Sequence, residues 1–129
     1  MRELRLLNLD KLIETEEHDS QRAHDLAENI KKKGVWTVPI AVEYSCYAIM
    51  DGHHRYNAAR LLDLKRVPCF MLDYHRSGIK LSSWRDDWII SVDDIFNMVR
   101  ENKKFPYKTT RHVFQPEIYE INVSINLLY

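Results

Sequence analysis

The chain has 129 residues, in which 19 lysine and arginine residues balance 19 aspartate and glutamate residues. This zero net charge excludes a global positive field, so we expect neither a membrane nor a nucleic acid as partner. Cys46 and Cys69 lie in apolar segments without metal-ligand spacing, which predicts free thiols in a reducing compartment. No signal-like start or membrane-length apolar run is found, so we predict a cytoplasmic protein.

Strand and helix patterns alternate through the first half of the chain. Apolar residues repeat at amphipathic spacing over residues 20–33, and Gly34 can end that helix. A second helical pattern begins after Gly52 and reaches Leu62. Strands are expected over residues 4–9, 39–44, 46–51 and 67–74, and an acidic loop over residues 13–21.

The second half has a weaker pattern. Residues 79–81 can pair as a short edge strand, and a helix over residues 91–103 opens with the Ser-x-x-Asp form of a capping box. Apolar and polar residues alternate over 121–127, which predicts a last strand. We therefore predict an α/β (α+β) fold, in which residues 1–129 form one compact domain with a small mixed sheet and three main helices.

The stretch DGHHR stands where a strand pattern gives way to a helix pattern. A helix that begins after Gly52 has unpaired N–H groups and partial positive charge at its start, which favours an anion. His53, His54 and Arg55 add donors suited to phosphate, and Asp51 can ligate Mg²⁺ or orient a hydroxyl. The alternative is that Asp51 caps the helix and one histidine is half-buried. Five polar groups at one turn favour the anion site.

Two other polar segments have open interpretations. The loop segment TEEH places Glu16 and Glu17 beside Glu14; it is either a solvated loop or the source of a proton acceptor or metal ligand. The segment KTTRH, residues 108–112, is either a second oxyanion clamp or a polar loop before the last strand. Trp84 is either an apolar wall for a small ligand or an ordinary aromatic residue. The six histidines lack zinc-ligand spacing.

In this order the segments resemble the ParB/sulfiredoxin superfamily. The resemblance rests on the EEH loop, on GVWTVPIAV and on MDGHHRYNAARLLDLKRVPCFMLDY, and covers roughly the first 75 residues. The end, FPYKTTRHVFQPEIYEINVSINLL, is similar to that of the free L-serine kinases of this superfamily. The resemblance implies a ParB-like enzyme that phosphorylates L-serine to O-phospho-L-serine, with ATP or ADP as phosphoryl donor and Mg²⁺ as cofactor.

The resemblance also implies residue roles. The catalytic glutamate matches Glu16 or Glu17, Asp51 matches the acid near the substrate hydroxyl and Mg²⁺, and Trp84 matches a tryptophan of the serine pocket. The phosphate-binding turn matches Gly52, His53, His54 and Arg55, and the group that receives serine or its phosphate matches Thr109, Thr110, Arg111 and His112. One feature departs from the archaeal kinases, which carry an additional domain between this tryptophan and TTRH; here little more than one helix joins the two motifs.

Three other functions are the alternatives to a serine kinase. The main alternative is a non-catalytic ParB-like nucleotide-binding regulator that contacts DNA or a protein. The neutral charge and the lack of a helix-turn-helix pattern argue against DNA. A sulfiredoxin-like reductase needs a cysteine at the phosphate turn, where this chain has His53. A nuclease needs a two-metal acidic cluster that the sequence lacks. Free L-serine kinase is therefore our primary hypothesis.

Overall fold

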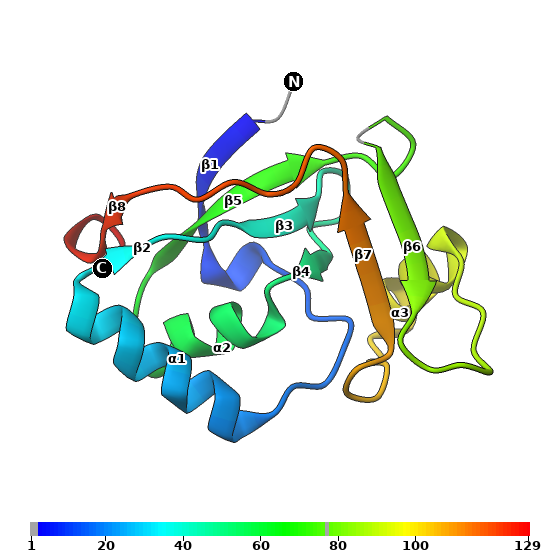
Figure 1. Cartoon of the computed structure of the whole chain (residues 1–129), viewed down its shortest axis with the longest axis horizontal. Coiled ribbons are helices and arrows are strands. Elements are labelled where there is room, and N and C mark those ends of the chain that lie inside the picture. The colour runs from blue at the N-terminus through cyan, green and yellow to red at the C-terminus, as the bar shows by residue number, and fades with distance from the viewer. Residues whose placement is uncertain (1–2, 77) are drawn as a thin grey trace.

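The centre of the fold is a four-stranded mixed sheet with the strand order β1-β5-β3-β4 (Figure 1). The computed structural model describes residues 3–76 and 78–129. The strands of this sheet are β1 (Glu3–Asn8), β5 (Arg66–Leu72), β3 (Ile40–Glu43) and β4 (Ile49–Asp51). Strands β3 and β5 run parallel, while β1–β5 and β3–β4 are antiparallel. All four strands were predicted from the sequence, with ends that differ by a few residues.

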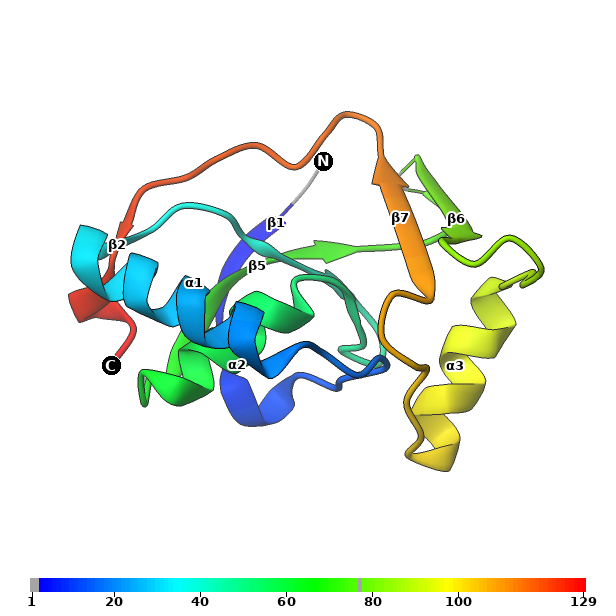
Figure 2. The same cartoon turned by 60° about the horizontal axis from the view of Figure 1, so that its bottom comes forward.

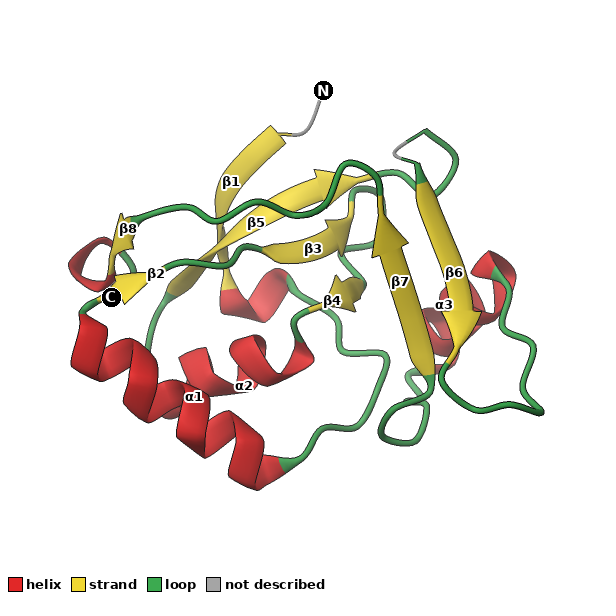
Figure 3. Ribbon diagram, viewed as in Figure 1, coloured by secondary structure: helices red, strands yellow, loops and turns green. Residues whose placement is uncertain are grey.

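Helices α1 (Ser20–Lys33) and α2 (His53–Leu61) lie side by side on one face of the sheet (Figures 1 and 3). Ile40 and Val42 of β3 pack on this side together with Tyr56 and Ala59 of α2. Ala41, between them in sequence, belongs to the cluster on the opposite face. Neighbouring residues of a strand point to opposite faces of a sheet, and all four residues of β3 are buried. Both faces of this strand are therefore covered by other parts of the chain.

The apolar cluster of the opposite face extends to β6 (Ile79–Ser83), α3 (Val92–Glu101) and β7 (Thr110–Phe114), which lie at one end of the sheet (Figure 2). Strands β6 and β7 form a separate antiparallel pair. The predicted edge strand at 79–81 is thus confirmed and extends to Ser83. The loop interpretation of residues 108–112 is wrong for most of its length, because Thr110 to His112 belong to a strand.

The predicted strand over residues 121–127 is also largely wrong. Only β8 (Val123–Ser124) is a strand, paired with β2 (Val35–Trp36), and a 3₁₀ helix follows at Ile125–Leu127. The Ser124 hydroxyl accepts a hydrogen bond from the backbone of Asn126, and Ile125 N–H donates to Gly34 O at 3.0 Å. These bonds turn the chain although its apolar residues alternate.

Local signals set the helix ends. The Asp19 side chain accepts hydrogen bonds from the first turn of α1, and Gly34 ends this helix with a left-handed backbone. Ser91 and Asp94 form the predicted capping box of α3. A short 3₁₀ helix, Leu9–Lys11, follows β1. Within the described ranges both cysteines are free thiols, and no helix has the length and hydrophobicity to cross a membrane.

Candidate active site

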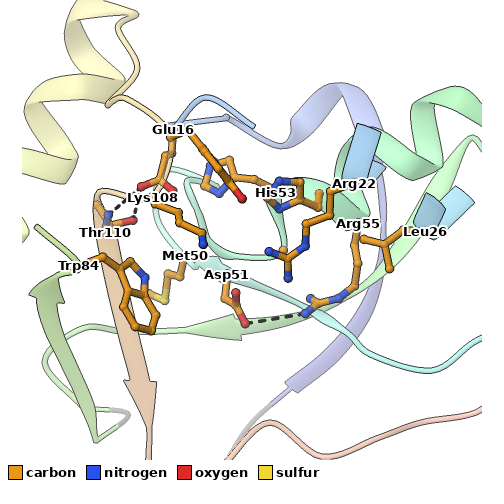
Figure 4. Close-up of a pocket in the computed structure, with 13 residues that line it drawn as sticks. Glu16, Arg22, Leu26, Met50, Asp51, His53, Arg55, Trp84, Lys108 and Thr110 are labelled. Atoms are coloured by element: carbon orange, nitrogen blue, oxygen red, sulfur yellow. Dashed lines mark hydrogen bonds and ion pairs between the residues drawn. The ribbon is translucent and has the colours of Figure 1, made fainter. Parts of the chain in front are cut away.

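Three segments that are distant in sequence surround one cavity of about 280 Å³ (Figure 4). They are the loop before α1 with the first half of that helix, the turn from β4 into α2, and the end of the β6–β7 pair at which β6 ends and β7 begins. Eight of the predicted site residues line the cavity: Glu16, Asp51, Gly52, His53, His54, Arg55, Trp84 and Thr110. Glu17, Thr109, Arg111 and His112 are not among its lining residues.

The β4–α2 turn requires a glycine at residue 52. Gly52 has φ +117°, and a Cβ built there would meet Arg55 Nη1 at 3.0 Å and an Ile40 side-chain carbon at 3.1 Å. Gly52 is also the N-cap of α2, and in the described part of the chain no side-chain cap hydrogen bond closes this end of the helix. The turn therefore leaves backbone donors at a helix N-terminus beside the cavity, as an anion site requires.

Arg55 lies on the first turn of α2 and is largely withdrawn from water. Its Nη1 is 3.5 Å from Pro39 O and its Nη2 is 3.9 Å from Asp51 Oδ2. Burial lowers the pKa of the guanidinium, and the nearby Asp51 carboxylate opposes this effect. Arginine nevertheless stays charged at neutral pH. A cation with one distant carboxylate partner keeps much of its capacity to bind a phosphate.

The two histidines of the turn act as acceptors for the chain. Thr15 N–H donates to His53 Nε2 at 3.1 Å, and Asp19 N–H donates to His54 Nε2 at 3.1 Å. An accepting Nε2 carries no hydrogen, so the neutral ring has its proton on Nδ1. Burial lowers the pKa of His53 to about 3 and also lowers that of His54.

These bonds leave only the Nδ1–H groups of the two rings as donors that a phosphate could use. Neither Nε2 can donate to a phosphate while it accepts from the chain, and burial disfavours a positive charge on either ring. The rings of His53 and His54 instead fasten the loop that carries Glu16 to the start of α2. The sequence alone could not reveal that both histidines are acceptors. Their partners, the backbone N–H groups of Thr15 and Asp19, lie 38 and 35 residues away in the chain.

Glu16 is held at the edge of β7. Its Oε1 accepts from Thr110 N–H at 2.7 Å, from Thr110 Oγ1 at 2.8 Å and from Thr109 N–H at 3.3 Å. Burial raises the pKa of this carboxyl, and the hydrogen bonds oppose the shift. The loop itself is fixed by a bridge between Glu16 and Phe105. A partly buried carboxyl with fixed geometry is a candidate proton acceptor.

The next residue, Glu17, is exposed, and its backbone N–H donates to Phe105 O. The sequence left Glu16 and Glu17 equivalent, whereas the structure places only Glu16 on the cavity wall. This difference follows from the extended backbone between Thr15 and His18, in which neighbouring side chains point in opposite directions.

The four side chains of the segment TTRH have four different environments. Thr110 reaches Glu16, while the buried Thr109 hydroxyl donates to Pro106 O at 2.7 Å. The Arg111 guanidinium lies 4.7 Å from the centre of the Trp84 ring and is exposed. His112 is 2.8 Å from the Tyr74 hydroxyl, and burial lowers the pKa of its ring to about 3. The clamp predicted for these four residues is thus not one surface.

Sequence reasoning missed two cations of the cavity. Arg22, on the first turn of α1, and Lys108, just before β7, both line it and extend toward its centre (Figure 4). Arg22 gave no signal beyond its place on the polar face of a predicted helix. Lys108 was noted only as a member of the KTTRH segment. With Arg55 they make three cations against two carboxylates, Glu16 and Asp51, which favours an anionic ligand.

Asp51 is the residue predicted to hold Mg²⁺. Its side chain is 54% exposed and lines the cavity, and among residues 3–76 and 78–129 its one ion pair is the 3.9 Å contact with Arg55. Within residues 3–76 and 78–129, no group of three or more histidine, cysteine or acidic residues could hold a metal ion. This arrangement excludes an all-protein metal cage there, but it fits Mg²⁺, which commonly binds one or two carboxylates together with substrate phosphates.

The fold and the glycine turn define an α/β domain of the ParB type. The model of the ParB N-terminal domain matches residues 1–80, and the chain belongs to this family. The ATP-dependent L-serine kinase of Staphylothermus marinus is 34% identical over 100 residues, which are 74% of this chain and 40% of the kinase. The ADP-dependent L-serine kinase SerK of Thermococcus kodakarensis is 28% identical over 82 residues, which are 60% of this chain and 34% of SerK.

Two solved structures have the same fold. A free serine kinase in complex with AMP superposes with a TM-score of 0.87 at 16% identity, covering 98% of this chain and 93% of that one. SbnI with a C-terminal truncation, from Staphylococcus aureus, has a TM-score of 0.81 at 13% identity, covering 96% of this chain and 88% of that one. The resemblance to the ParB/sulfiredoxin superfamily is thus confirmed. The chain spans less than half the length of the two L-serine kinases named above.

Proposed function

We propose that this chain is a free L-serine kinase, which transfers a phosphoryl group from ATP or ADP to the serine hydroxyl and forms O-phospho-L-serine. One observation carries the proposal: Glu16, the Asp51–Arg55 turn and Thr110 face one cavity with Trp84 on its wall. The curated relatives named L-serine kinases support the choice of serine as acceptor.

The donor nucleotide lies with its phosphates at the start of α2. Backbone N–H groups of that helix, Arg55 and Arg22 surround this part of the cavity. A second, smaller hollow shares Leu26 and Arg55 with the cavity and is walled by Ile30, Val35 and Trp36 among others. This largely apolar hollow suits the nucleoside, so that Arg55 stands between the nucleoside and the phosphates.

Asp51 is the residue that would hold Mg²⁺, beside the phosphates of the donor. The ion supplies positive charge that neutralises the phosphates and orients them for transfer. The exposed carboxylate of Asp51, at the end of β4 and beside the phosphate turn, supports this assignment. Its distant contact with Arg55 leaves it available to a cation of higher charge.

Glu16 accepts the proton of the serine hydroxyl. The serine oxygen forms a bond to the terminal phosphorus, while the bond from this phosphorus to the bridging oxygen breaks and its electrons remain on the departing nucleotide. The fixed position of the Glu16 carboxyl, bonded to Thr110, and the upward shift of its pKa by burial suit a general base. Most of the rate enhancement then comes from positioning and charge neutralisation.

Phosphorus NMR tests this function. The purified chain is incubated with Mg²⁺, with ATP or ADP, and with L-serine or L-threonine. We expect a phosphoserine signal that depends on protein and nucleotide, and the faster of the two nucleotides identifies the donor. Nucleotide binding without phosphorylated amino acid under all four combinations would contradict the kinase and favour the nucleotide-binding regulator.

A further inference from the structure

The cations of the cavity stand on two opposite walls. Arg22 and Arg55 come from α1 and α2, on the side that the proposed function gives to the donor (Figure 4). Lys108 comes from the turn before β7, beside Glu16 and Trp84, and its ammonium end points into the cavity. Burial raises the pKa of the Glu16 carboxyl, and the backbone of Lys108 is among the groups that oppose this shift by stabilising the ionised form. Lys108 is thus the cation on the wall of the acceptor.

The backbone at Lys108 is unusual for its residue type. Its φ is +55°, the left-handed region that side chains with a Cβ rarely occupy. The turn around it is fixed from several directions: Arg85 Nη2 donates to Tyr107 O at 3.0 Å, and Thr109 Oγ1 donates to Pro106 O at 2.7 Å. Non-glycine residues keep such a conformation where the surroundings impose it, and they concentrate at ligand sites. Here the conformation directs a lysine into the cavity.

A free surface lysine is the ordinary alternative, since Lys108 is exposed and its Nζ lies 5.7 Å from the Tyr107 ring. Two observations favour a site role. Lys108 lines the cavity, and the more obvious cation of the same segment, Arg111, instead stacks on Trp84 outside it. The acceptor wall therefore receives its positive charge from Lys108.

We propose that Lys108 contacts the phosphoryl group during transfer and stabilises the negative charge on its oxygens. In the ground state the phosphates lie against the donor wall, near Arg22 and Arg55. As the terminal phosphorus moves toward the serine oxygen, its oxygens approach the wall that carries Glu16 and Lys108. An interaction that strengthens on this path raises kcat without tightening nucleotide binding. This inference rests on the proposed function and adds a catalytic residue to it.

Two variants separate the charge of Lys108 from its backbone. Lys108→Asn removes the cation while asparagine tolerates a left-handed backbone, and Lys108→Arg keeps the charge. We expect Lys108→Asn to lower kcat about 100-fold with an unchanged Kd for the nucleotide, and Lys108→Arg to recover part of the loss. Lys80→Asn, on the exposed face of β6, is the matched control and should keep wild-type rates.

Other outcomes overturn the proposal in distinct ways. A rise in serine KM at unchanged kcat would make Lys108 an anchor for the amino acid, and a weaker nucleotide Kd in proportion to the lost rate would make it a donor ligand. A full rate in Lys108→Asn, or no recovery in Lys108→Arg, would remove it from catalysis. If the wild-type chain forms no phosphoserine, the proposed function fails and the role of Lys108 fails with it. If the wild type is active but a variant gives any of these results, only the role of Lys108 is overturned.

Discussion

Two short polar segments of this chain resemble anion sites, and the structure treats them differently. All five residues from Asp51 to Arg55 line the cavity, whereas of residues 108–112 only Lys108 and Thr110 do. The first segment is the end of a strand, a glycine and the first turn of a helix, where consecutive groups gather around the helix start. The second enters β7, where consecutive side chains alternate between two faces. A dense polar cluster therefore predicts a binding site best where the backbone turns.

The alternation of side chains along an extended backbone also separates Glu16 from Glu17, which are neighbours in one loop. The largest expected effect tests this pair. We expect Glu16→Gln to lower kcat by about 100-fold or more, because the amide cannot accept the serine proton, while nucleotide affinity stays close to wild type. Glu17→Gln is the control, since this side chain is exposed and off the cavity wall. Equal losses in both variants, measured by steady-state kinetics, would remove the distinction.

The glycine of the turn gives the next effect. Gly52→Ala adds a Cβ at φ +117° and 3.0–3.1 Å from atoms of Arg55 and Ile40, so we expect the free energy of unfolding to fall by about 2 kcal/mol and ADP binding to weaken. Gly34→Ala is the matched control, because Gly34 also has a positive φ, +73°, but nothing lies within 4 Å of its Cβ position. It should lose only about 1 kcal/mol and keep ADP affinity. Urea unfolding and calorimetric titration measure both quantities.

The buried histidine of the turn makes stability depend on pH. Burial lowers the pKa of His53 to about 3, against 6.5 for an unperturbed histidine. Between these values the unfolded chain binds the extra proton, so the free energy of unfolding falls as the pH falls below 6.5 and the effect levels off near 3. The slope from one such group approaches about 1.4 kcal/mol per pH unit.

His53→Gln should therefore flatten this dependence, since a carboxamide does not titrate. His24→Gln, on the exposed surface of α1, is the control for the substitution itself. Urea unfolding at pH 7, 6 and 5 compares the three proteins. The burial of His53 as a neutral acceptor would be contradicted if His53→Gln lost stability with acidification as steeply as the wild type.

The smallest effect is expected for Arg111 on β7, and its neighbour Thr110 should give a larger one. Arg111→Gln removes the cation that stacks on the Trp84 ring, an exposed contact worth about 0.5–1 kcal/mol. Because Trp84 lines the cavity, we expect serine KM to change by roughly two- to fivefold. Thr110→Val removes a hydroxyl donor to the Glu16 carboxylate and should lower kcat by about tenfold or more. If Arg111→Gln lowers activity more than Thr110→Val does, Arg111 leaves Trp84 to bind the substrate. The assignment of the TTRH side chains to separate environments would then be wrong.

Much of the fold was accessible from the sequence because its signals are local. The spacing of apolar residues predicted the helix from Ser20 to Lys33, and Ser91 and Asp94 predicted the cap of α3. The prediction failed where a contact from elsewhere decided the backbone. Ile125 binds Gly34, and this bond with the Ser124 turn replaced the expected strand by a 3₁₀ helix.

For the site, the sequence alone determined that an acid, a glycine and an arginine meet at a strand-to-helix turn, because that chemistry lies within five consecutive residues. The tertiary structure decided which glutamate and which cation face this turn. Glu16 and Lys108 reach the cavity through contacts between the first loop and the segment near β7, more than 90 residues apart. It also made His53 and His54 acceptors for distant backbone amides. Hydrogen bonds between remote segments set these roles, and no local pattern records them.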